Sequence, residues 1–171
     1  MSRSGYTDDE CDDPLAHGRW RGQVAAAIRG KRGQSALREL AAAMDAMPVK
    51  ELAAESLVTE EGEFCTLGVL GQARSLDMAP IDPEDWDAVA AAFNLAPSMV
   101  REIVYENDES VSTDNWIEVE LCGPLSPYWP DRGRRHRSYR IDLPADEVAR
   151  QRWAHMREWV AKHTIIPKGQ P

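Results

Sequence analysis

An arginine-rich segment is the first place where residue types and spacing suggest chemistry. It carries five arginines, Arg132, Arg134, Arg135, Arg137 and Arg140, and three large aromatic residues precede it, Trp116, Tyr128 and Trp129. Arginine mixed with aromatic side chains suits single-stranded nucleic acid, where bases stack on rings, or the centre of a protein interface. The non-functional alternative is a solvated loop whose positive charge balances that of nearby acidic residues. We expect these eight residues to bind a partner.

A run of carboxylates offers a second candidate. It includes Glu102, Glu106, Asp108 and Glu109, and no basic residue occurs between Glu102 and Glu120. Grouped carboxylates can hold a metal ion, perform acid–base catalysis or form an acidic docking face. The spacing does not match an EF-hand, because the required glycine and terminal glutamate are missing. We expect an acidic face without a tight metal site, and a solvated helix end is the plainer alternative.

Cysteine and histidine supply weaker signals. Cys65 lies near the start of an expected helix, where a thiolate would be stabilised, but a nucleophile also needs a base, and every histidine is distant in sequence. A buried Cys65 is therefore the expectation. His155 and His163 lie eight residues apart, whereas zinc needs closer ligands and a third partner. We expect no catalytic residue, no metal and no cofactor.

The segment Phe64–Leu76 is expected to be the element around which the others pack. From Cys65 to Gly71 only Thr66 is polar, and a helix that is apolar all round belongs inside a core. Apolar residues at helical spacing predict further helices in 15–28, around 37–44, from 82 to 93, from Pro97 to 107, and in 145–163. Asp82 and Pro83 read as a cap followed by the first helical position.

A different pattern interrupts the helices within residues 111–144. Residues 116–121 alternate apolar and polar side chains, and 139–143 could pair with them across a Pro-, Gly- and Arg-rich loop. The expected fold is therefore mainly α, a helical bundle around the buried helix 64–76 with a small β-hairpin insertion at about 116–143. We expect residues 15–166 to form one domain, residues 1–14 to be disordered, and residues 167–171 to form a loose tail.

Composition limits the classes of partner. The 171 residues carry a formal net charge of −9, which argues against general binding to a nucleic-acid backbone and could steer a basic partner. No apolar run approaches the roughly 20 residues of a membrane span, so we expect no membrane partner. The polar, acidic start lacks an apolar signal core, and three scattered cysteines do not form a disulfide framework. These features favour a cytoplasmic protein.

Three short segments carry a resemblance to known sequences. They are Cys65–Gly71, then Ile103–Glu109 (Ile-Val-Tyr-Glu-Asn-Asp-Glu), then Arg152–Val160. In this order they resemble a group of small bacteriophage and prophage proteins without an assigned function. The group often has Ala at the place of Thr66, and the insertion 116–143 is peculiar to this chain. The resemblance implies a phage setting in a bacterial host cell and supplies no catalytic residue.

These observations leave three functional hypotheses. The first is a non-enzymatic phage accessory protein that binds a host macromolecule, with a host protein or complex as the expected partner. Its concrete version inhibits a host defence complex, and a DNA-mimic variant would use the acids of 102–120. The second is a nucleic-acid-binding regulator that acts through residues 132–140. The third, ranked last, is a small metal-dependent hydrolase. Fold alone cannot choose among them, and the sequence does not indicate an oligomeric state.

Overall fold

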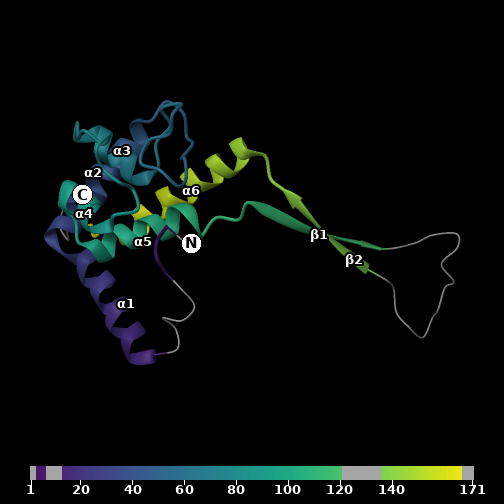
Figure 1. Cartoon of the computed structure of the whole chain (residues 1–171), viewed down its shortest axis with the longest axis horizontal. Coiled ribbons are helices and arrows are strands. Elements are labelled where there is room, and N and C mark those ends of the chain that lie inside the picture. Colours follow the sequence, from purple (N-terminus) through teal and green to yellow (C-terminus); the bar gives the residue numbers. More distant parts are fainter. Residues whose placement is uncertain (1–2, 7–12, 121–135, 167–171) are drawn as a thin grey trace, which may run out of the picture.

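The computed structural model describes residues 3–6, 13–120 and 136–166. In this part of the chain, helices form a body from which a two-stranded antiparallel sheet projects (Figure 1). The expectation of a mainly α fold with a small β-hairpin is confirmed at this level. Among the described residues, no helix combines the length and apolar character that crossing a membrane requires. The elements are, in chain order, α1 Pro14–Arg29, α2 Lys31–Ala46, α3 Thr66–Ala73, α4 Trp86–Ala92, α5 Pro97–Asp108, β1 Asp114–Glu120, β2 His136–Asp142 and α6 Ala145–His163.

The helices of the body share one apolar core. Leu37, Leu40 and Met44 lie at helical spacing on α2 and are almost fully buried. They belong to one cluster with buried residues of α3, α5 and α6, including Leu70, Val100, Ile103, Met156 and Val160. The apolar residues that recur at helical spacing in the sequence are therefore the residues that form the core between the helices.

The segment expected as a 13-residue central helix is shorter in the structure. Helix α3 contains eight residues, Cys65 caps its start, and Phe64 pairs with Val58 in an isolated β-bridge. Thr66 to Gly71 are buried. Position 68 requires glycine because the Leu57 backbone approaches it closely: a Cβ there would lie 1.9 Å from the carbonyl oxygen of Leu57. That approach accounts for the glycine despite its cost to the helix.

Other boundaries confirm or correct the sequence analysis. Helix α6 has the predicted bounds, and α5 begins at Pro97 as expected. The predicted start at Asp82 and Pro83 is wrong: Asp82 accepts a hydrogen bond from the Glu84 amide in a turn, and α4 begins at Trp86 behind the cap Asp85. Residues 3–6 also differ from the expected disordered start, because they pack against α5 and Ser4 is fully buried.

Candidate functional site

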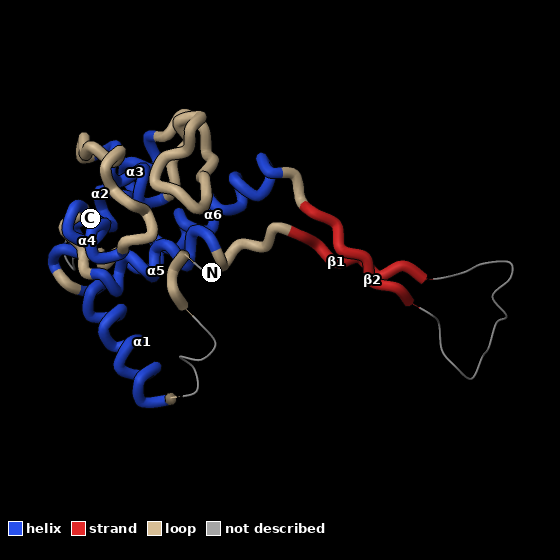
Figure 2. The backbone as a smooth tube through the Cα atoms, viewed as in Figure 1, coloured by secondary structure: helices blue, strands red, loops and turns tan. Residues whose placement is uncertain are grey.

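The projecting sheet, here called the arm, consists of β1 and β2 (Figure 2). Its register pairs Asp114 with Asp142 at the body end and Glu120 with His136 at the far end. Side chains alternate between the two sides of a sheet, and directly paired residues share a side. The arm therefore has a tryptophan face, with Asp114, Trp116, Glu118, Ser138, Arg140 and Asp142, and an apolar face, with Asn115, Ile117, Val119, Arg137, Tyr139 and Ile141.

Two of the predicted partner-binding residues lie directly opposite each other on the tryptophan face. Trp116 is paired in register with Arg140, and it is 66% exposed. The Arg140 Nε lies 2.8 Å from a carboxylate oxygen of Asp114 and 3.5 Å from one of Asp142. Two carboxylates thus bind this guanidinium on the face that also carries the indole. The sequence analysis selected both residues by their types, but their position opposite each other depends on the strand register.

The remaining predicted binding residues divide between the other face and undescribed positions. Arg137 lies on the apolar face, opposite Val119, and so does not join Arg140. Tyr128, Trp129, Arg132, Arg134 and Arg135 lie outside the described residues. The apolar face itself was not singled out from the sequence. Ile117, Val119, Tyr139 and Ile141 are between 40% and 47% exposed there, and the strand alternation was the signal that could have revealed it.

The structure places the predicted acidic residues on and just beyond α5, where each meets a group of the same chain. Glu102 accepts a hydrogen bond from the Tyr6 hydroxyl (2.8 Å), and Glu109 accepts one from the Ser4 amide (3.1 Å). Asp108 forms an ion pair with Arg3 at 3.0 Å, in which both side chains are less than 8% exposed. These three carboxylates hold residues 3–6 against the body.

Aromatic rings complete the attachment of residues 3–6. The Arg101 guanidinium lies 4.6–4.8 Å from the ring centroids of Trp20, Trp86 and Tyr6, and it donates hydrogen bonds to the carbonyls of Ser4 and Gly5. Burial, followed by the hydrogen bond to Glu102, raises the pKa of the Tyr6 hydroxyl well above its usual range. No pattern in the acidic N-terminal sequence indicated this cluster.

Glu106, the fourth predicted acid, pairs with His155 of α6. The His155 Nε2 lies 2.7 Å from a Glu106 carboxylate oxygen and 2.9 Å from the Ser110 hydroxyl. A serine-histidine-acid triad needs the serine and the acid on opposite ring nitrogens. Because both partners meet the same nitrogen, this cluster does not have the geometry of a triad. His163, the other candidate on α6, contacts the Trp159 carbonyl through Nδ1 (2.8 Å).

Cys65 belongs to a buried polar network. Its thiol caps α3 at the Gly68 amide, and burial raises its pKa, which opposes formation of a nucleophilic thiolate. Next to it, Asn107 accepts hydrogen bonds from the Thr66 amide and hydroxyl, and Arg152 donates to the Asn107 carbonyl. The three segments that carry the sequence resemblance thus meet inside the body. A buried network with satisfied partners specifies packing.

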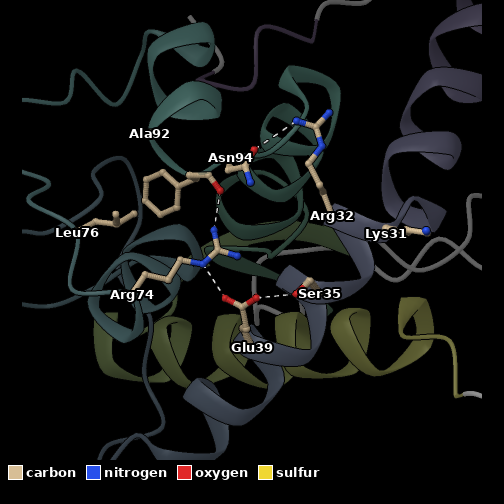
Figure 3. Close-up of a pocket in the computed structure, with 9 residues that line it drawn as sticks. Lys31, Arg32, Ser35, Glu39, Arg74, Leu76, Ala92 and Asn94 are labelled. Atoms are coloured by element: carbon tan, nitrogen blue, oxygen red, sulfur yellow. Dashed lines mark hydrogen bonds and ion pairs between the residues drawn. The ribbon is translucent and has the colours of Figure 1, made fainter.

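A hollow with a volume of about 520 Å³ lies between α2 and the ends of α3 and α4 (Figure 3). Lys31, Arg32 and Arg74 line it, but Arg74 is already bound to the Glu39 carboxylate (2.7 Å) and the Phe93 carbonyl (2.6 Å). The Phe93 ring is fully buried, so it offers no stacking surface. Arg74 therefore fastens three helices together and is not free to receive an anion.

Neither a search for metal-binding clusters nor comparison with known proteins assigns a further site. Within the described ranges, no three His, Cys, Asp or Glu residues are grouped closely enough to hold a metal ion. Comparison with protein-family models, curated proteins and solved structures gives no match. The resemblance to phage proteins therefore stays a prediction, and the arm is the candidate functional site.

Proposed function

We propose that the chain is a non-enzymatic binding protein that docks on another protein through the tryptophan face of its arm. The observation that carries this proposal is the exposed Trp116 beside Arg140 on a sheet that stands away from the body (Figure 1). Burying the exposed part of one indole is worth about 3 kcal/mol, and tryptophan with arginine is a typical centre of binding energy.

Charge favours a protein over a nucleic acid as the partner. The described tryptophan face holds three carboxylates, Asp114, Glu118 and Asp142, against the single arginine Arg140. A phosphate backbone would meet net repulsion there. The predicted contacts of Tyr128, Trp129, Arg132, Arg134 and Arg135 extend this proposal, and the nucleic-acid regulator becomes an outcome of the test.

The biological setting rests on the sequence resemblance. We propose a phage accessory protein in the host cytoplasm, whose partner is a host protein complex and whose concrete activity is inhibition of a defence complex. The intramolecular contacts of Glu102, Asp108 and Glu109 do not support the DNA-mimic variant. In this proposal α3 is the structural centre of the body and takes no part in binding.

The test compares two surfaces of the same purified protein. Wild type and a Trp116→Ser/Arg140→Gln variant are immobilised, exposed to nuclease-treated host lysate, and the retained proteins are identified and re-tested as purified partners. The matched control is Leu15→Ser/Arg150→Gln, which removes an exposed apolar residue and an ion-paired arginine from the body. Circular dichroism confirms that all three are folded.

The proposal predicts one partner that binds wild type and control and is lost from the arm variant by at least tenfold, about 1.4 kcal/mol. Equal binding by all three proteins would show that the tryptophan face is not the site. Retention of nucleic acid from untreated lysate, released steeply as salt rises, would instead favour the regulator hypothesis.

A further inference from the structure

We infer that the apolar face of the arm pairs with the same face of a second copy of this chain, with the two arms antiparallel. The face presents four partly exposed apolar side chains, Ile117, Val119, Tyr139 and Ile141, on a sheet that has two strands in the described part of the chain. The arm stands away from the helices, so the body does not cover this face (Figure 2). A two-stranded hairpin is marginally stable alone in water, and it gains stability when a second layer covers its apolar side.

The residue order on this face fits a twofold axis. Along the arm the rows are Asn115–Ile141, Ile117–Tyr139 and Val119–Arg137. A twofold axis through the middle row and perpendicular to the strands places Ile117 over the partner's Ile117 and Tyr139 over the partner's Tyr139. The outer rows then exchange, so that Val119 meets the partner's Asn115. The two polar residues of this face, Asn115 and Arg137, therefore each lie opposite an apolar residue of the partner, and no two like charges lie opposite each other.

Charge selects the antiparallel arrangement over the parallel one. Arg137 lies at the far end of the arm on the apolar face, whereas the body end leads into Asp146 and Glu147 in the first turn of α6. Antiparallel arms bring Arg137 to the acidic end of the partner. They also keep two bodies of a chain with net charge −9 at opposite ends. Parallel arms would bring the acidic ends together.

The inference goes beyond the proposed function because it uses the opposite side of the arm. Paired apolar faces leave Trp116 and Arg140 of both copies directed outward. The second copy and the protein partner are therefore bound by different residues, and each proposal can fail without the other.

The first experiment measures the mass of the full chain by sedimentation velocity from about 1 μM to about 1 mM, the range expected for a small interface. Ile117→Thr/Tyr139→Thr removes the apolar face and retains residues suited to strands. Glu118→Thr/Ser138→Thr is the matched control, since it changes neighbouring positions on the other face. We expect wild type and control to form dimers, and the apolar-face variant to associate at least tenfold more weakly.

A crosslinking experiment tests the arrangement without depending on the stability of a weakened arm. In chains with Cys11→Ser and Cys122→Ser, the remaining Cys65 is buried. A short thiol-reactive crosslinker should join two copies of Ile117→Cys, and should join Val119→Cys to Asn115→Cys, but should not join Val119→Cys to itself. A monomer at every concentration, a dimer that survives the apolar-face variant, or crosslinking of Val119→Cys to itself would each overturn the inference.

Discussion

The buried ion pair between Arg3 and Asp108 anchors residues 3–6 to the body. Both side chains are more than nine-tenths buried, and the remaining partners of the Asp108 carboxylate are the Asn107 side-chain amide and the Glu55 amide. Breaking a buried pair from one side leaves an uncompensated charge. The contribution of Arg3 should therefore far exceed that of arginines on the surface.

Arg3→Met should lower the free energy of unfolding by about 3 kcal/mol, because Asp108 stays buried without its cation. Urea denaturation followed by circular dichroism measures this loss. Arg150→Met is the control, since Arg150 pairs with Asp146 at an exposed site and its removal should change little. Equal effects of the two substitutions would contradict the anchoring role of Arg3.

A second residue-scale prediction concerns pH. Arg157 holds the Asp45 carboxylate by two hydrogen bonds of 2.7 and 2.8 Å, which lowers the pKa of Asp45 below its usual range. A carboxyl with a lowered folded-state pKa stabilises the fold above its unfolded value, about 3.9, and this stabilisation disappears as the pH falls through the folded-state pKa. The melting temperature should therefore decrease as the pH is lowered below about 4. Arg157→Gln should melt lower than wild type near neutral pH, and the two curves should converge in acid; parallel curves would exclude this linkage.

At the scale of elements, local sequence signals predicted the bounds of a helix correctly where only one residue could start or continue it. Pro97 starts α5, and the apolar stripe of α6 runs without interruption between Ala145 and His163. The signal failed at α4, because Asp82 and Asp85 can each cap a helix and only the tertiary contacts of Trp86 choose between them. The Trp86 indole donates a hydrogen bond to the Arg3 carbonyl (2.7 Å), a contact that local spacing cannot reveal.

The two glycines of α3 provide an element-scale prediction. A Cβ at Gly68 would meet the Leu57 backbone, whereas a Cβ at Gly71 would meet the flexible Met78 side chain, at 2.3 Å from its sulfur. Gly68→Ala should therefore cost more stability than Gly71→Ala, by about 1–3 kcal/mol, because the backbone cannot move aside as a methionine can. Thermal melts of both variants measure the difference. A cost at Gly68 no larger than that at Gly71 would contradict the close approach of the Leu57 backbone to α3.

At the scale of the whole molecule, the sequence indicated the arm but not its surroundings. Alternation at Trp116–Leu121 predicted strands, and the charge and aromatic content predicted a contact surface. The attachment of residues 3–6 could not be predicted, because Arg3, Ser4 and Tyr6 find partners about 100 positions away, on and just beyond α5. Such contacts depend on the folded arrangement of helices rather than on spacing.

The arm should be separable from the body. The Leu143 amide donates to the Thr113 carbonyl (2.9 Å), so the ends of the insertion lie close together. Replacing residues 114–142 with a short Gly-Ser linker should leave the free energy of unfolding of the body within about 0.5 kcal/mol of wild type, as for surface changes generally. Urea denaturation of both proteins tests this. A large loss would mean that the arm supports the helices and does not only project from them.

The ring cluster around Arg101 has a consequence for observing the molecule. Detachment of residues 3–6 would free the Trp86 indole from the Arg3 carbonyl, release the Trp20 indole from the Tyr6 hydroxyl (3.0 Å) and expose both rings to water. Two indoles that change their surroundings together shift the emission of the protein to longer wavelength. In a Trp116→Phe/Trp129→Phe variant, which lacks both indoles of residues 114–142, the intrinsic fluorescence would therefore report in real time whether residues 3–6 are seated on the body.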